Sequence, residues 1–365
     1  MLVSAVVSTY NAQRFIRGRL QNLIDQTLYQ KGLLEIIVVD SGSQEDEATI
    51  VQEFSSKNRN IYYLRTQNRE TVYRAWNRGI AVSRGRYFIN ANTDDRFIDD
   101  ALEKLADVLE KQPTVDAAYG DWLYTETEND HIDSSSPKKI YKYPEFYPPL
   151  LFYHQFTSHA LMIRSSAFPK VGLFNARMEV FGDREWVFRF SLVGRKAVHI
   201  QKSVGLYLKR ADSLERTSRD FGEKEFNSLL RYYQELENFF PLHGYENLPV
   251  NRELAQLYAM TGALGIHFVA NDGLNGIRLP SQSLIFFRRA LALDQGNLMA
   301  SNNLAVAAAL QGGQKFAVES FLRLLEYKFL DWNRLNKNLE MAQNRSQDIT
   351  KYHWYHNKHF CIKNN

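Results

Sequence analysis

The segment YFINANTDDRF (residues 87–97) joins an apolar run directly to two adjacent carboxylates, Asp94 and Asp95. Gly85 precedes the segment, and a helical pattern follows it at about residues 99–111. An apolar run between a glycine and a polar cluster is typical of a short buried strand. Because adjacent carboxylates repel each other, either solvent or a bound cation has to offset the repulsion after this strand.

The residues around this segment alternate between apolar and amphipathic stretches. Strands are predicted at 2–8, 34–40, 60–66, 86–91 and 116–124, with helices at 12–30, 42–57, 71–83 and 99–111. The runs LVSAVVS (2–8) and LEIIVVD (34–40) are continuously apolar, as strands covered on both faces require. Strands separated by helices predict an α/β fold, with a mostly parallel sheet and helices on both faces.

Polar clusters follow three of these strands: STYN after the first, DSGS after the second and NTDD after the fourth. Ligands bind beyond the carboxyl ends of the strands in such sheets. Carboxylate oxygens there suit Mg²⁺ or Mn²⁺, and a lone acceptor such as Asp40 suits a nucleobase N–H or a ribose hydroxyl. Taken alone, each acid fits the cap of a helix or a solvated turn better than a binding role, so the prediction rests on the set.

Length and composition limit the possible classes of protein. A chain of 365 residues predicts two domains, and a net charge of +4 gives no support for nucleic-acid binding. One cysteine, Cys361, excludes an intrachain disulfide and fits a reducing compartment. The chain has no apolar run of transmembrane length, and its first residues lack the basic leader of a signal peptide, so we expect a cytoplasmic protein.

The character of the sequence changes in its second half. Residues 129–150 are rich in Ser and Pro and predict a surface excursion that returns at HALMIRS (159–165), where His159 is expected to be structural. Long helical patterns begin beyond residue 220. We therefore predict an α/β domain at 1–220 and an α-helical region at 221–365.

The helical region contains an internal repeat. Residues 283–294 and 317–328 align at an offset of 34, which is the period of the tetratricopeptide repeat. Residues 253–262 and 303–312 align at an offset of 50, which an insertion at 266–281 explains. The alternative is a generic helical bundle. Such a region binds a protein partner, positions a long acceptor, or only packs on the first domain.

The last residues, KYHWYHNKHFCIKNN (351–365), are basic and aromatic and contain no acid. One hypothesis is peripheral contact with an anionic membrane surface at the inner face of the membrane, where lipid-linked acceptors reside. The other is a frayed polar tail.

Four segments together resemble the successive motifs of the family 2 glycosyltransferases with a GT-A fold. They are VVSTYNAQRFIRGRLQNLIDQT, EIIVVDSGSQED, RAWNRGIAVSRGRYFINANTDD and GDREWVFRFSLVG, and they span about residues 3–215. The resemblance implies a GT-A fold for nucleotide-diphospho-sugar transfer, followed here by the all-α region. It also implies a nucleoside-diphosphate sugar donor, with a UDP-sugar expected, a metal held by a DxD-type motif, and a later aspartate that deprotonates the acceptor.

The resemblance assigns roles to individual residues. The donor nucleotide is expected to contact Ser8, Thr9, Asn11, Asp40, Arg74 and Asn92. Asp94 matches the aspartate that binds Mn²⁺ or Mg²⁺, and Asp95 is the second candidate. Asn92 replaces the first acid of the usual motif, so the charge available to the metal is reduced.

Asp183, in EVFGDREWVFRF, matches the aspartate that activates the acceptor. Gly182 stands where the family often has Glu, while the base and the downstream Arg189 are retained. Asp183 is also expected to cap the helix that follows, and the two roles are compatible. Arg210 lies about where the family often has a histidine, and it is a candidate contact of the diphosphate.

These observations predict a metal-dependent inverting glycosyltransferase of polysaccharide biosynthesis, acting on a glycan or lipid-linked acceptor. Two alternatives remain. A nucleotidyltransferase normally has a Gly- and Lys-rich loop after its first strand, and STYNAQRF offers none. A non-catalytic nucleotide-sugar-binding or helical-repeat scaffold is the other alternative, and Asn92 keeps it open.

Overall fold

The structure is a computed structural model. It describes residues 1–132, 139–143, 145, 146, 148, 151, 160–210, 212, 281–325 and 332–345, with isolated residues between 225 and 259. The chain divides into two compact units, Met1–Pro148 with Gln155–Ser218 and Pro149–His154 with Arg219–Asn365. The predicted domain limits at 220 and 221 stay a proposal.

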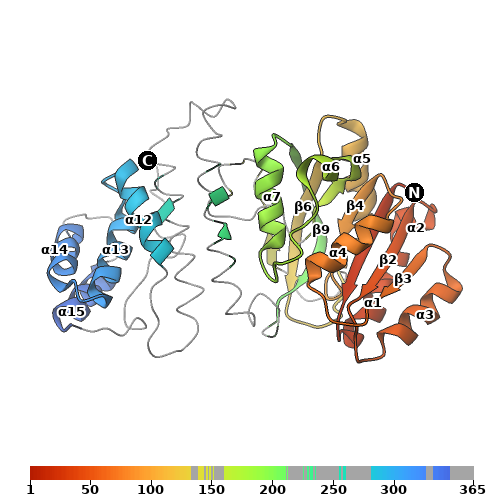
Figure 1. The fold of residues 1–365 in the computed structure, drawn as a ribbon, viewed down its shortest axis with the longest axis horizontal. Coiled ribbons are helices and arrows are strands. Elements are labelled where there is room, and N and C mark those ends of the chain that lie inside the picture. The colour runs from red at the N-terminus through yellow and green to blue at the C-terminus, as the bar shows by residue number, and fades with distance from the viewer. Residues whose placement is uncertain are drawn as a thin grey trace. The chain divides into compact units, whose positions relative to one another are not determined.

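The first unit contains the sheet. Its strands are β1 (Val3–Thr9), β2 (Leu34–Asp40), β3 (Ile61–Arg65), β4 (Tyr87–Asn90), β5 (Arg96–Phe97), β6 (Ala117–Thr125), β7 (Lys139–Tyr141), β8 (Met162–Arg164) and β9 (Ala197–Leu208). Its helices are α1 (Gln13–Ile24), α2 (Thr27–Gln30), α3 (Glu47–Lys57), α4 (Val72–Val82), α5 (Ala101–Lys111), α6 (Phe168–Val171) and α7 (Gly182–Leu192). Figure 1 shows the strands side by side, with these helices packed along them.

The strand order among the described residues is β3-β2-β1-β4-β8-β6-β9-β5, and β7 pairs with β6. Strands β3, β2, β1 and β4 are parallel to one another, as the alternation of the sequence predicts. The second half is mixed, because β8 runs antiparallel to β4 and β6 while β9 runs parallel to β6. The predicted α/β fold is confirmed, with a sheet that is parallel in its first half and mixed in its second.

The core explains why β1 and β2 are so apolar. All seven residues of β2 are buried, and β1 is buried from Val3 to Val7. Helix α4 approaches β1 closely at Gly79, where an added Cβ would lie 2.4 Å from Cγ1 of Val6. A larger residue at position 79 would push α4 away from the sheet, so Gly79 allows α4 to pack closely on β1.

Three local features differ from the sequence predictions. The predicted helix at 12–30 is broken at Asp25 and Gln26 into α1 and α2. The predicted helix at 42–57 begins only at Glu47, because the preceding residues form a loop held by side chains. Strands β5 and β9 were not predicted. The segment Arg96–Phe97 is only two residues long and becomes a strand only because it pairs with Leu206 and Gly205 of β9.

The second unit is described from α12 (Ser281–Leu293) through α13 (Leu298–Leu310) and α14 (Gln314–Leu325) to α15 (Trp332–Gln343). Helix α13 is buried along most of its length. The starts of α12 and α14 lie 33 residues apart, and those of α13 and α15 lie 34 apart. The helical region is confirmed, whereas the tetratricopeptide assignment stays a prediction.

Several predicted segments cannot be compared with the structure. The inserted segment 266–281, except for Ser281, lies outside the described residues, as do the tail 351–365 with Cys361, and His159. In the part of the chain that the structure describes, no helix is both long and apolar enough to cross a membrane.

Candidate functional site

The predicted donor residues come from neighbouring strand ends. Thr9, the last residue of β1, is the register partner of Asp40, the last residue of β2, and the Ser41 N–H donates to the Thr9 carbonyl at 2.9 Å. On the other side of β1, the Ala91 N–H donates to the Val6 carbonyl at 2.8 Å, just before the loop that carries Asp94. The three polar clusters therefore lie at one edge of the sheet, as the sequence predicts.

Asp40 is completely buried, and both of its carboxylate oxygens have partners. Its Oδ1 accepts a hydrogen bond from the Ser43 N–H at 2.8 Å, and its Oδ2 accepts one from the Tyr63 hydroxyl at 2.5 Å. Burial, followed by the hydrogen bond to Asp40, raises the pKa of Tyr63. Asp40 thus holds the loop after β2, and because it is completely buried, a contact with a nucleobase requires a neighbouring group to move.

The loop after β1 is fixed by side chains from the loop after β2. Asn11 has a φ of 47°, in the left-handed region that Asn tolerates better than most residues. Its Oδ1 accepts from the Gln44 N–H at 2.8 Å, and its own N–H donates to the Ser43 hydroxyl at 3.1 Å. Ser8 is half-buried, whereas the Thr9 hydroxyl is buried without a hydrogen-bond partner among the described residues.

Asp94 and Asp95 differ sharply in their surroundings. Asp94 is partly exposed, and its Oδ2 accepts a hydrogen bond from Nε of Arg210 at 2.9 Å. Asp95 is 2% exposed, and its two oxygens face the Leu208 N–H at 3.3 Å and the Asn92 amide at 3.4 Å. Burial and the neighbouring charge of Asp94 raise the pKa of Asp95 to about 8. Asp95 is therefore the poorer metal ligand of the two.

Three arginines among the described residues lie near these two acids. Arg210 contacts Asp94 directly, and Arg19 and Arg96 lie buried close enough for the charges of both acids to raise their pKa values. Burial, the larger effect, lowers both, for Arg19 to about 9. Arginine side chains therefore lie beside these acids, where the sequence suggested solvent or a bound ion.

Arg19 is the most unusual of these cations. It is completely buried, its Nη1 donates to Oδ1 of Asn22 at 3.0 Å, and its guanidinium lies 4.3 Å from the centre of the Phe97 ring. Its Nε and Nη2 atoms have no hydrogen-bond partner within the described part of the chain. Arg96 is better paired, since it donates to the carbonyls of Thr93 at 2.9 Å and Asp95 at 2.6 Å.

Asp183 lies in the first turn of α7, whose N-cap residue is Phe181. Its Oδ1 accepts from the Arg184 N–H at 2.8 Å and from the Tyr73 hydroxyl at 3.2 Å. The Tyr73 hydroxyl has one proton, which it shares between the Val180 carbonyl at 2.6 Å and Asp183, so the contact with Asp183 is the weaker branch of a bifurcated hydrogen bond. The predicted capping role is thus only partly right, because Asp183 follows the cap position instead of occupying it.

Gly182 fits against the Tyr73 ring. An added Cβ at position 182 would lie 2.6–2.7 Å from three carbons of that ring. This close approach explains in physical terms why a glycine precedes Asp183, where the resemblance leads one to expect Glu.

The start of α4 holds the segment that leads to Asp183. The Thr71 hydroxyl, which caps α4, donates to the Ala176 carbonyl at 3.0 Å. Asn77 exchanges two hydrogen bonds with the backbone of Phe174, at 2.8 and 3.0 Å. Because α4 follows the parallel strand β3, its first turn lies at the carboxyl edge of the sheet. Through Tyr73 of that first turn, Asp183 is held toward the carboxyl edge of the sheet, and Arg74 is exposed in the same turn.

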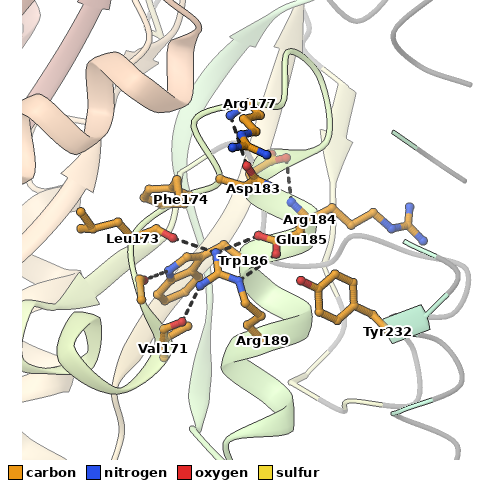
Figure 2. Close-up of polar contacts among 12 residues, drawn as sticks. Val171, Leu173, Phe174, Arg177, Asp183, Arg184, Glu185, Trp186, Arg189 and Tyr232 are labelled. Atoms are coloured by element: carbon orange, nitrogen blue, oxygen red, sulfur yellow. Dashed lines mark hydrogen bonds and ion pairs between the residues drawn. The ribbon is translucent and has the colours of Figure 1, made fainter. Parts of the chain in front are cut away.

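Figure 2 shows how the other side of α7 is fastened. Arg189 forms two hydrogen bonds with Glu185, at 2.8 and 2.7 Å, and donates to the carbonyls of Val171 and Leu173. Trp186 donates from its indole nitrogen to the Gly172 carbonyl at 2.9 Å. Arg189 is thus fully engaged in fixing α7, which supports Asp183 indirectly.

The residues present fit a divalent ion in one way only. No group of three or more His, Cys, Asp or Glu side chains among the described residues is arranged to hold a metal. Asp94 is the exposed acid, and a single carboxylate completed by substrate phosphates is a usual arrangement for Mg²⁺. The site therefore fits a metal that arrives with a phosphate ligand.

Sequence reasoning missed Arg19 and Tyr73. A signal for each was present, because both fall among the buried, periodically spaced residues of an amphipathic helix. A charged or hydroxyl-bearing residue in such a position needs a polar partner, and this requirement indicates a nearby polar site.

Part of this sequence is shared with known glycosyltransferases. Residues 4–171 match the family described as "Glycosyl transferase family 2". The chain is 25% identical over 228 residues to the glycosyltransferase GlyG of Streptococcus pneumoniae serotype 4, covering 60% of this chain and 74% of GlyG. It is 27% identical over 273 residues to GlyA of the same organism, covering 71% of this chain but only 38% of GlyA.

A solved structure shares the fold. The S. aureus TarS fragment 1–349, determined in complex with UDP-GlcNAc, superposes with a TM-score of 0.50 at 14% identity, covering 96% of this chain and 90% of the fragment. The protein is a glycosyltransferase. More specifically, its residues 4–171 match the family 2 glycosyltransferases, and its fold is GT-A-like.

Proposed function

We propose that the protein is an inverting glycosyltransferase that moves a sugar from a nucleoside-diphosphate sugar to an acceptor hydroxyl. The observation that carries the proposal is the placement of Asp183. Tyr73 and Thr71 of the α4 start contact the segment that carries Asp183, and this supports a base at the carboxyl edge of the sheet. A base at that edge and a leaving-group site beside it are the two parts that a single displacement needs.

Asp183 is the proposed base. A sugar hydroxyl is a poor nucleophile, and loss of its proton to a positioned carboxylate accelerates such reactions by about 10²–10⁴-fold. Attack from the face opposite the diphosphate inverts the anomeric centre. Tyr73 and the Arg184 N–H orient the carboxylate through Oδ1.

Asp94 and Arg210 are the proposed groups on the leaving-group side. A Mn²⁺ or Mg²⁺ ion held by Asp94 and the donor phosphates would neutralise charge that develops on the diphosphate. Arg210 is suited to contact the phosphates, because its planar guanidinium matches their geometry. We assign the nucleoside to the edge formed by Ser8, Thr9, Asn11, Asp40, Arg74 and Asn92. The Thr9 hydroxyl, which has no hydrogen-bond partner among the described residues, supports this assignment, since a buried hydroxyl without a partner is costly unless a ligand supplies one.

The donor is proposed to be a UDP-sugar, by analogy with the UDP-GlcNAc complex of the TarS fragment. The acceptor is proposed to be a glycan or lipid-linked saccharide in polysaccharide biosynthesis. The helical unit is proposed to bind such an acceptor or a protein partner, and membrane contact through the tail stays a prediction.

A thermal-shift panel of UDP, GDP, dTDP and their sugars, each with and without Mn²⁺, tests the donor side. Stabilisation by one nucleotide, larger with Mn²⁺, is expected, because ligands stabilise the folded state in proportion to their binding. NMR of the anomeric proton in the product then tests inversion. Absence of stabilisation by every nucleotide would contradict the proposal, and a retained anomeric configuration would contradict the mechanism.

A further inference from the structure

The ion pair between Asp94 and Arg210 is held from several sides. Nε of Arg210 lies 2.9 Å from Oδ2 of Asp94, and Nη1 lies 3.2 Å from Oδ1 of Asp212. The guanidinium also lies 5.1 Å from the centre of the Phe15 ring of α1. Arg210 follows β9, whereas Asp94 follows β4, so the contact joins two separate parts of the sheet.

Asp212 extends this pair into a chain of charges. It also pairs with Nη2 of Arg14 at 2.6 Å, and Nη1 of Arg14 pairs with Glu128 at 2.9 Å. Arg14, Asp212 and Glu128 are about half exposed, whereas the side chain of Arg210 is 25% exposed. Screening by solvent weakens the outer pairs, and the Asp94–Arg210 contact is the more protected one.

Asp94 therefore already has a cation in contact with it, and it also feels the buried charges of Arg19 and Arg96. A carboxylate oxygen paired with a guanidinium cannot coordinate a divalent ion without bringing two cations close together. The resulting repulsion opposes metal binding as long as Arg210 stays in place. A diphosphate changes this balance, since its oxygens are better partners for a guanidinium than one carboxylate oxygen is.

We propose that Arg210 is an exchangeable counter-ion of Asp94. It neutralises Asp94 while no donor is bound, and it moves to the diphosphate when the donor arrives, so that Asp94 becomes available to the divalent ion. The inference rests on the proposed function, and it adds an order of events: the metal binds with the nucleotide and binds poorly before it. Arg210 can make this move because its side chain is long and its neighbour Asp212 lies at the surface.

The first test measures Mn²⁺ binding without nucleotide, by electron paramagnetic resonance of free Mn²⁺. The variants are Arg210→Gln, Arg210→Lys and the control Arg14→Gln. The control removes one charge from the same series of ion pairs, but Arg14 does not contact Asp94. Arg210→Gln is expected to bind Mn²⁺ at least about tenfold more tightly than the wild type, because the competing cation is gone. Arg210→Lys and Arg14→Gln are expected to stay within about threefold of the wild type, because each leaves a cation near Asp94.

The second test repeats the titration with UDP, or with the nucleotide that the thermal-shift panel selects. The order of the two affinities is expected to reverse. Arg210→Gln should bind the Mn²⁺–nucleotide complex about tenfold more weakly than the wild type, because a phosphate contact is lost. Thermal unfolding of each variant checks that it is folded.

Different results would overturn the counter-ion exchange and the proposed function. Equal Mn²⁺ affinity of wild type and Arg210→Gln without nucleotide overturns the exchange, even when nucleotide binds normally. Mn²⁺ binding by Arg210→Lys as tight as that by Arg210→Gln would also overturn the exchange, because the lysine keeps the positive charge that is proposed to oppose the metal. Failure of every nucleotide to bind the wild type overturns the proposed function instead.

Discussion

The Tyr73 hydroxyl lies 3.2 Å from Oδ1 of Asp183 and 2.6 Å from the carbonyl oxygen of Val180. One side chain of α4 therefore contacts both the proposed base and the backbone just before it. Because Tyr73 is 3% exposed and packs edge-to-face on Trp76 at 5.2 Å, its position is fixed by the core. The core of the α/β unit thus extends directly to the residue proposed to activate the acceptor.

Replacing Tyr73 by Phe is expected to lower kcat by about tenfold and to leave the KM for the donor nearly unchanged, because Asp183 and the Val180 backbone just before it lose the hydroxyl that positions them. The measurement is steady-state kinetics with the donor found in the panel. Tyr29→Phe, in α2, serves as the matched control. A change confined to the donor KM would show that Tyr73 acts on the other substrate.

Replacing Gly182 by Ala is expected to lower the unfolding free energy by about 1–3 kcal/mol, because the added Cβ meets the Tyr73 ring. Chemical denaturation measures the change. The double variant Tyr73→Leu with Gly182→Ala should lose less stability than the sum of the single changes, since both alter one contact. Strict additivity would mean that the ring and residue 182 do not interact.

Replacing Asp40 by Ala is expected to lower the unfolding free energy by about 1–3 kcal/mol, because the Ser43 N–H and the Tyr63 hydroxyl both lose their partner. Asp107→Ala, an exposed position in α5, should change it little. If Asp40→Ala is as stable as the control but loses nucleotide binding, then Asp40 acts on the donor alone.

The Glu70–Arg78 pair gives a pH-dependent prediction about the start of α4. Arg78 donates two hydrogen bonds to Glu70, each 2.6 Å long, and this contact lowers the pKa of Glu70 below its ordinary value of 4.5. The contribution to stability is therefore present above about pH 4.5 and is lost as the pH falls through the lower folded-state pKa. Arg78 is half exposed, so the effect is small.

Denaturation of wild type and Glu70→Gln at several pH values measures this contribution. The wild type should be the more stable protein at pH 7, and the difference should shrink as the pH falls below 4.5. A difference that stays constant with pH would contradict the ionic origin of the contact.

The first half of the fold was predictable because the apolar sequences of its strands indicate that the strands are buried. Strands β1 and β2 are continuous apolar runs, and each is followed by a polar cluster. Strand β5 was not predictable from local sequence, because Arg96–Phe97 is defined only by its pairing with β9. Contacts between distant segments determine such elements, so the sequence of the short segment alone does not indicate a strand.

The same distinction holds at the site. Asp94 and Asp183 could be proposed from motifs, but their partners Arg210 and Tyr73 lie 116 and 110 residues away in sequence. Asp40 illustrates the opposite case, because its position was predicted whereas its complete burial was not. Spacing indicates which residues share an edge of the sheet, and only the packed structure indicates which of them are exposed to a ligand.

The central claim, that Asp183 activates the acceptor while a separate set of residues binds the donor, is tested most directly by Asp183→Asn. Asp107→Asn is the matched control. Titration calorimetry with Mn²⁺ and the selected nucleotide should give an unchanged affinity, while the rate of sugar transfer falls by at least about 10²-fold. Full transfer activity in Asp183→Asn, with nucleotide binding intact, would contradict the account.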